Sequence, residues 1–251
     1  MARIVAIANQ KGGVGKTTTC VNLTAALHGL GYRVLMVDCD PQGNGSSGMG
    51  VKKTSRPNTY DLLINQAAPE ECVVHTPYGD VIPTGKELAA ASVELIGKEN
   101  REYVLKTALQ QLYADYDYIL IDCPPSLELL TVDALVAADS VLIPMQCEYY
   151  ALEGIADLMT SIRMCSRRLN RRLSIEGIVL TMFDGRANLS NQVAGELRRH
   201  LGDKVYQTVI PRSVRLSEAP SHGVPGVLYD KANKGSKAYM ALAEEFSARC
   251  K

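Results

Sequence analysis

The chain has 251 residues, of which 46% are hydrophobic and 22% are charged, and its formal net charge is zero. This composition is typical of one globular domain with a large core, and no apolar run is long enough to span a membrane. An apolar strand begins directly at the N-terminus, and the seven cysteines show neither C-x-x-C nor metal-ligand spacing. We therefore expect no signal peptide, reduced cysteines and a cytoplasmic location.

The first predicted elements are a buried strand over residues 4–8 and a helix that starts near residue 20, with a glycine-rich turn between them. Glycines allow the backbone N–H groups of such a turn to point inward around an anion. The helix N-terminus and the Lys16 ammonium add positive charge, and Thr17 supplies a hydroxyl for a phosphate-bound Mg²⁺. The turn therefore predicts a phosphate-binding loop.

This loop differs from the ordinary phosphate-loop motif, G-x-x-x-x-G-K-[ST], which would place a glycine where this chain has Gln10. A second lysine, Lys11, begins the loop instead, and the resulting pattern K-G-G-x-G-K-T is the deviant Walker A motif. We expect the phosphates of a nucleotide to be bound by Lys11, Gly12, Gly13, Val14, Gly15, Lys16, Thr17 and Thr18.

Two carboxylates follow the second predicted strand, which covers residues 32–38. Asp38 and Asp40 lie at the carboxyl end of that strand, where α/β sheets bind ligands. The segment 43–58 is rich in Gly, Ser and Lys and is predicted to be a mobile loop. Beyond it, the pattern predicts a short helix over 60–66, a short strand over 81–83, and helices over 87–96 and 99–113.

The strand predicted over residues 118–122 is apolar and ends in Asp122, which is the Walker B pattern. By itself Asp122 could be a turn-forming residue, but beside a phosphate loop we expect it to hold the Mg²⁺ shell through water. The remaining predicted elements are helices over 127–137, 151–169, 189–201 and 236–246 and strands over 140–144, 175–182 and 205–210. This alternation predicts a single-domain, three-layer α/β fold over residues 1–251, with a mostly parallel twisted sheet flanked by helices on both faces.

The zero net charge hides an asymmetry along the chain. Between Arg163 and Arg215 there are eleven Lys and Arg residues and four acidic residues, so this segment carries +7 and the remainder −7. The segment fits either a polyanion-binding face or an ordinary solvated helix face. It includes Arg186 and Arg215, which we expect to lie in loops and to contact DNA phosphates. No helix-turn-helix or zinc motif is evident, so we expect such binding to be independent of sequence.

Several stretches together resemble the ParA/MinD family of deviant Walker A ATPases, and its ParA branch in particular. The superfamily is indicated by the loop 11–18, the turn 38–43 and the segment 121–126. The ParA branch is indicated by the stretches 148–154, 181–184 and 211–220. The resemblance runs from about residue 2 to about residue 246 and implies a P-loop ATPase fold.

The resemblance also implies roles for individual residues. ATP and Mg²⁺ would bind between two subunits of a homodimer, with Lys16 on the phosphates and Lys11 reaching the partner's nucleotide, as an arginine finger does. Asp40 would position the attacking water. Thr17 would be a direct Mg²⁺ ligand, with Asp38 and Asp122 organising the metal shell. Pro211 and Ser213 would line the adenine site, although an ordinary proline-containing loop is an equal alternative on the residues alone.

The family further implies a biological cycle. ATP-bound dimers would bind double-stranded DNA non-specifically on the nucleoid, and a ParB-type centromere-binding protein would stimulate an otherwise slow hydrolysis. The process would be chromosome or plasmid segregation, with no membrane partner.

Three alternatives remain open. A MinD-like membrane-cycling ATPase would carry a basic amphipathic C-terminal helix, whereas this chain ends with two acidic residues and one aromatic residue in its last ten positions. An iron–sulfur relative would present cysteines in surface loops, and neither Cys123 nor Cys147 is expected there. A purely structural nucleotide-binding module would leave Asp40 without a catalytic role.

Overall fold

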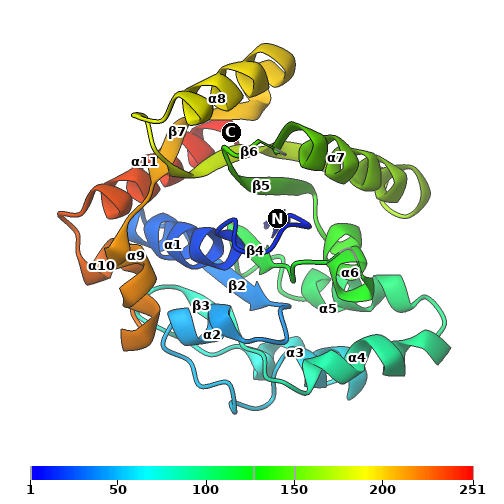
Figure 1. Ribbon diagram of the computed structural model, residues 1–251. Helices are drawn as coiled ribbons and strands as arrows, with labels where there is room; N and C mark the ends of the chain where they lie inside the picture. The colour runs from blue at the N-terminus through cyan, green and yellow to red at the C-terminus, as the bar shows by residue number, and fades with distance from the viewer. Residues whose placement is uncertain (1, 127, 150, 251) are drawn as a thin grey trace.

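The computed structural model describes residues 2–126, 128–149 and 151–250 (Figure 1). Within these ranges it contains one seven-stranded sheet of order β3-β2-β4-β1-β5-β6-β7, in which every paired strand is parallel to its neighbour. The strands are β1 (Arg3–Ile7), β2 (Val34–Asp38), β3 (Asp80–Ile82), β4 (Tyr118–Asp122), β5 (Ser140–Gln146), β6 (Ser174–Phe183) and β7 (Val205–Pro211). The predicted parallel α/β sheet is confirmed.

Helices cover both faces of this sheet, as Figure 1 shows. Side chains alternate along β1, so that Ile4 and Ala6 pack on one face and Val5 and Ile7 on the other. The first face is covered by α3 (Thr59–Ile64), α4 (Leu88–Glu94), α5 (Val104–Gln110), α6 (Leu129–Ala137), α7 (Ala151–Arg168) and α8 (Asn188–Leu201). The second is covered mainly by α1 (Lys16–Gly29) and α11 (Lys234–Arg249).

Three shorter helices lie near the carboxyl edge of the sheet: α2 (Asn44–Gly48), α9 (Val214–Glu218) and α10 (Gly226–Tyr229). The prediction of a loop over 43–58 is wrong in its first part, because α2 forms there after Gly43, whose φ of 61° is left-handed. A five-residue Gly/Ser helix has no apolar periodicity, so the sequence pattern could not show it.

Other differences lie at helix boundaries. The helix predicted over 99–113 is a 3-10 turn (Arg101–Tyr103) followed by the shorter α5, and the last helix extends further in both directions than predicted. The helix predicted over 127–137 begins at Leu129, and Leu127 lies outside the described residues. No helix in the described part of the chain is long and apolar enough to cross a membrane.

The topology brings the predicted site residues to one edge. β2, β4 and β1 are neighbours, with Asp38 opposite Asp122 and Asp122 opposite Ile7. Because all three strands are parallel, the phosphate loop after β1 and the carboxylates that end β2 and β4 meet at the carboxyl edge of the sheet, the usual ligand edge of such folds.

Candidate functional site

The phosphate loop is a fixed turn at the N-terminus of α1. Gly13 and Gly15 adopt left-handed φ values of 75° and 88°, which residues with a side chain rarely adopt. Two neighbouring strands hold the outside of the loop, since Gln146 donates to the Gly13 carbonyl (2.9 Å) and Thr181 donates to the Val14 carbonyl (2.7 Å). α1 begins at Lys16 without a side-chain cap, so its first N–H groups are available to stabilise an anion at this loop.

Lys16 lies beneath this loop and is 6% exposed. Its ammonium donates to the Lys11 carbonyl over 3.1 Å. Burial lowers the pKa of Lys16, and the nearby Asp122 and Asp40 carboxylates oppose that change. Lys16 is thus a buried cation that a polyphosphate could neutralise without moving the backbone.

Asp38 and Asp122 are fully buried side by side at the ends of β2 and β4. Burial raises the pKa of Asp38 to about 6, although hydrogen bonds from Ser46 and from the Asp40 N–H act in the opposite direction. Burial, and then the Asp38 charge, raises the pKa of Asp122 well above its usual range. Two adjacent carboxylates in a dry site disfavour ionisation of both, and a bound cation would reverse that.

The donor set fits Mg²⁺. Among the described residues, neither oxygen of the Asp122 carboxyl has a hydrogen-bond partner, and the Thr17 hydroxyl lies close enough to favour its charged form. A Cβ at Gly45 would lie 3.0 Å from Asp38 Oδ2 and 3.2 Å from Asp122 Oδ2, so glycine allows α2 to approach both carboxylates closely. No cage of three or more His, Cys, Asp or Glu exists in the described chain. Mg²⁺ suits such a site because it keeps waters and takes further ligands from phosphates.

Asp40 lies beside this pair and is 8% exposed. Its Oδ1 accepts a hydrogen bond from the Gln42 N–H (2.9 Å). The carboxylate predicted to position water is therefore brought to the same edge as Lys16 and Asp122.

Pro211 and Ser213 lie on a small cavity of about 80 Å³ together with Gly15 and Thr18. A larger cavity of about 510 Å³, which the sequence did not predict, shares Thr18 with it and continues past Thr17 toward α2 and α10. Ser213 donates to the Asn233 side chain (2.8 Å), which also caps α11. The residues expected at the base and those expected at the phosphates are thus neighbours around one helix N-terminus.

Lys11 points away from the phosphate loop. Its side chain is 56% exposed and forms an ion pair with Glu148 of the same chain. No sequence motif pairs these two residues, which are 137 positions apart, so sequence reasoning missed this contact.

The two predicted DNA-contacting arginines both lie at the carboxyl edge. Arg186 is in the loop between β6 and α8, as expected, with a 93% exposed side chain near Asp184. Arg215 is not in a loop, because it lies in α9, where its side chain pairs with Glu218 (2.9 Å) and Asp230 (3.6 Å). The short α9 has no sequence periodicity that would predict it.

The +7 segment does not form one face. The C-terminal ends of α7 and α8 lead into the starts of β6 and β7, so most of its cations lie at the amino edge of the sheet. That group comprises Arg163, Arg167, Arg168, Arg171, Arg172, Arg198, Arg199 and Lys204. Only Arg186, Arg212 and Arg215 lie on the side of the phosphate loop.

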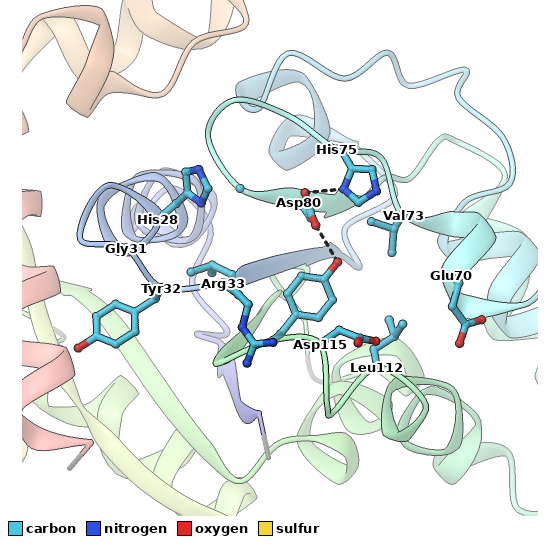
Figure 2. A pocket seen from close by; sticks show the side chains of 13 residues that line it. His28, Gly31, Tyr32, Arg33, Glu70, Val73, His75, Asp80, Leu112 and Asp115 are labelled. Atoms are coloured by element: carbon cyan, nitrogen blue, oxygen red, sulfur yellow. Dashed lines mark hydrogen bonds and ion pairs between the residues drawn. The ribbon is translucent and has the colours of Figure 1, made fainter.

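The amino edge has a cavity of its own, of about 500 Å³, which contains none of the predicted site residues (Figure 2). Figure 2 shows Asp80 at its centre, accepting from the Tyr116 hydroxyl (2.8 Å) and paired with His75 (2.9 Å). The candidate site is therefore the carboxyl edge, where the predicted residues converge.

Known proteins resemble this chain over its whole length. A family model described as an AAA domain matches residues 2–175. Sporulation initiation inhibitor protein Soj of Bacillus subtilis is 53% identical, covering 99% of this chain and 99% of that protein. Chromosome partitioning protein ParA of Myxococcus xanthus is 51% identical, covering 99% of this chain and 89% of that protein. The chain belongs to the Soj/ParA family of chromosome-partitioning ATPases.

Solved structures place the Soj/ParA chain within the wider ParA/MinD fold. Cobyrinic acid a,c-diamide synthase of Mycobacterium smegmatis, solved with an ATP analogue and magnesium, is 34% identical, with a TM-score of 0.85 over 97% of this chain and 93% of that one. MinD of Pyrococcus horikoshii, complexed with Mg-ADP, is 28% identical, with a TM-score of 0.82 over 98% and 96%. Since partitioning relatives are about half identical, the MinD-like alternative is not favoured.

Proposed function

We propose that this Soj/ParA chain binds ATP·Mg at the loop 11–18, hydrolyses it slowly, and uses the nucleotide to control dimerisation and non-specific DNA binding in a partitioning system. The observation that carries the proposal is the buried Asp122, unpartnered among the described residues, beside the buried Lys16 at the N-terminus of α1. Burial disfavours the charged forms of Lys16 and Asp122, and bound phosphate and a bound cation would stabilise them.

Each residue has a distinct task in this proposal. The loop N–H groups and Lys16 bind the phosphates, and Thr17 and Asp122 hold the Mg²⁺, which neutralises charge on them. Asp40 orients the attacking water, and Pro211 and Ser213 border the adenine. Lys11 leaves Glu148 and contacts the nucleotide of the second subunit.

The Asp40 carboxylate provides the test of catalysis. We expect Asp40→Ala to bind ATP like the parent but to lose hydrolysis stimulated by DNA and a ParB-type partner, measured as phosphate release. Asp40→Asn is the matched control, because Asn retains an oxygen that can accept from the Gln42 N–H while it replaces the other oxygen, and the charge, by an amide NH2. If Asp40→Ala turned over at the parental stimulated rate, the proposed role of Asp40 would be excluded.

Gly12 tests the dimer. A Cβ at Gly12 would meet only Pro125 Cβ, at 3.9 Å, so the described chain itself tolerates a side chain there. A second subunit that packs against the loop would not tolerate it. We expect Gly12→Val to bind ATP as a monomer in sedimentation, with Gly12→Ala intermediate. An ATP-dependent dimer of Gly12→Val would contradict the proposed sandwich.

Arg186 tests DNA binding, because its guanidinium is almost fully exposed. We expect Arg186→Ala to lose ATP-dependent binding to unrelated duplexes in mobility shifts, and parental binding to weaken steeply with salt. Arg215→Ala should also weaken ATP-dependent DNA binding. Arg171→Ala, an exposed arginine at the amino edge, is the control and should bind like the parent. Equal losses for Arg171→Ala and Arg186→Ala would refute the assignment to the carboxyl edge.

A further inference from the structure

The two buried carboxylates of the site differ in how their oxygens are used. Asp38 Oδ2 accepts hydrogen bonds from both the Ser46 N–H (2.6 Å) and the Ser46 hydroxyl (2.7 Å), and Asp38 Oδ1 accepts from the Asp40 N–H (3.2 Å). Asp122, in contrast, has no hydrogen-bond partner of normal geometry on either oxygen within the described ranges, and the Thr17 hydroxyl and the Lys16 ammonium are the neighbours that favour its charged form. Asp38 is therefore engaged with the protein, whereas Asp122 is available to a ligand.

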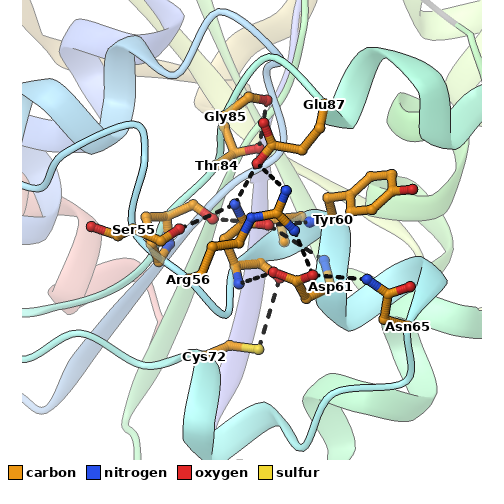
Figure 3. A network of polar contacts seen from close by, with 12 residues as sticks. Ser55, Arg56, Tyr60, Asp61, Asn65, Cys72, Thr84, Gly85 and Glu87 are labelled. Carbon is orange, nitrogen blue, oxygen red and sulfur yellow. Dashed lines mark hydrogen bonds and ion pairs between the residues drawn. The ribbon is translucent and has the colours of Figure 1, made fainter.

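The contact between Asp38 and Ser46 continues to the next strand. The Ser46 hydroxyl accepts from the Thr84 N–H (3.0 Å), and both side chains are fully buried. A hydroxyl has one proton, so accepting from Thr84 directs that proton toward Asp38. Thr84, just after β3, lies next to the polar network of Arg56, Asp61 and Glu87 that Figure 3 shows. The chain from Asp38 to Ser46 and Thr84 thus ties α2 to the sheet.

This arrangement fixes the turn that carries Asp40. The turn starts at Asp38, whose Oδ1 holds the Asp40 N–H, and it ends at Ser46, which is held by the same carboxylate. Within it, the Gly43 N–H donates to the Asp40 carbonyl (2.8 Å). One buried carboxylate therefore closes the turn at both of its ends.

We propose that Asp38 and Ser46 are positioning residues that hold Asp40 in place, and that Asp38 does not belong to the Mg²⁺ shell, to which the sequence analysis assigned it. The inference rests on the proposed ATPase function. Asp122 and Thr17 are the protein residues at the metal site, and Asp38 holds the turn 38–46 in its conformation.

The first experiment compares Ser46→Ala with Ser47→Ala. Ser47 is the matched control because its hydroxyl bonds only the Gly43 carbonyl within the same turn (3.2 Å). In nucleotide-free protein, we expect Ser46→Ala to speed amide hydrogen exchange of residues 39–49 by at least about tenfold, since the hydroxyl makes two buried hydrogen bonds and losing one corresponds to roughly that factor. Ser47→Ala should change it by less than about twofold. Exchange outside residues 39–49 should be unchanged in both variants, except at Thr84 in Ser46→Ala, whose N–H loses its acceptor. Equal exchange in the two variants would overturn the proposal.

Kinetics separate positioning from binding. In Ser46→Ala we expect the stimulated kcat to fall by about tenfold while ATP affinity stays within about twofold, because the turn is loosened and the phosphate loop is not. Ser46→Thr, which retains the hydroxyl, should restore most of kcat. A loss of ATP affinity equal to the loss of kcat would contradict a positioning role.

The decisive experiment compares the metal affinity of two further variants, Asp122→Asn and Asp38→Asn. Mn²⁺ binding to the ADP complex, followed by electron paramagnetic resonance, should weaken strongly in Asp122→Asn and remain within about twofold of the parent in Asp38→Asn. Equal weakening in the two variants would return Asp38 to the metal shell and defeat the inference. Absence of Mn²⁺·ADP binding in the parent would instead refute the proposed nucleotide function, so the two failures are distinguishable.

Discussion

The pKa values of charged groups shift in opposite directions at the two edges of the sheet: the charged forms are disfavoured at the carboxyl edge and favoured at the amino edge. At the carboxyl edge, burial lowers the pKa of Lys16 and raises the pKa of Asp122, so the charged forms are disfavoured. At the amino edge, hydrogen bonds from the Arg33 side chain and N–H lower the pKa of Asp117, so its charged form is favoured. The Arg33–Asp117 pair is satisfied within the protein, whereas the buried Lys16 and Asp122 would be stabilised in their charged forms by a bound ligand of opposite charge.

The largest expected effect comes from removing the buried cation of the carboxyl edge. Lys16→Ala should weaken ATP binding in calorimetry by at least about 100-fold, because a charge-assisted contact to phosphate is lost in a dry site. Lys11→Ala is the matched control, since this exposed lysine of the same loop should leave the affinity of the monomer nearly unchanged. Undiminished ATP affinity in Lys16→Ala would mean that the buried charge of the carboxyl edge does not serve nucleotide binding.

Asp133 shows that burial without a partner does not by itself make a site. Like Asp122, it has no hydrogen-bond partner in the described chain, but it lies in α6, away from the cations of the carboxyl edge. Burial, and next the Glu102 charge, raises its pKa to about 7, with Arg101 opposing. The native protein therefore favours the protonated form, and stability is lost as pH rises from about 4, where the unfolded group ionises, through about 7.

Asp133→Asn should remove this pH dependence. Since one pKa unit corresponds to about 1.4 kcal/mol, the variant should gain up to about 4 kcal/mol relative to the parent at pH 8, and little at pH 4. Chemical unfolding of both proteins at several pH values measures the difference directly. A difference that stayed constant with pH would mean that Asp133 is ionised in the native state.

The amino edge should respond through stability rather than function. Glu176 is 8% exposed, pairs with Arg3 and accepts from the Ser140 hydroxyl (2.9 Å). We expect Glu176→Ala to lower the free energy of unfolding by about 2–3 kcal/mol, since it leaves a partly buried cation and a buried hydroxyl unpaired. Glu176→Gln retains an acceptor for Ser140 and should cost less. ATP affinity should equal that of the parent in both variants. A loss of affinity would show that the amino edge also contributes to nucleotide binding.

The sequence predicted the features that depend on local pattern. The loop 11–18 was recognisable because glycine positions, lysines and flanking strand and helix all lie within about 25 residues, and the structure confirms that strand, turn and helix. The parallel sheet followed from long apolar strands that alternate with helices. Asp38, Asp122 and Lys16 could be brought together from the sequence because parallel strands share one carboxyl edge.

What the sequence could not show depends on packing between distant segments. The contact of Ser46 with Asp38 requires α2, and that of Lys11 with Glu148 joins residues 137 positions apart. Arg215 was expected in a loop because a five-residue helix gives no periodic signal. The +7 segment was treated as one candidate face because charge along a chain does not reveal which end of a helix each residue occupies.

The smallest expected effect comes from Arg33, although it makes several contacts with Asp117. Its guanidinium donates to Asp117 Oδ1 (3.0 Å) and to the Ala114 carbonyl (3.2 Å), but the side chain is 59% exposed. The Arg33 N–H also donates to Asp117 (2.8 Å), and Arg33→Ala retains this main-chain donor.

We therefore expect Arg33→Ala to lower the melting temperature less than Glu176→Ala does, and the difference from the parent to shrink further in about 0.5 M salt, which screens exposed pairs. Differential scanning calorimetry at two salt concentrations measures this. Arg33 also borders the cavity of the amino edge, so the same variant tests that region for function. Parental ATP and DNA binding would leave this edge with a purely stabilising role, whereas a loss of either would show that function extends to both edges of the sheet.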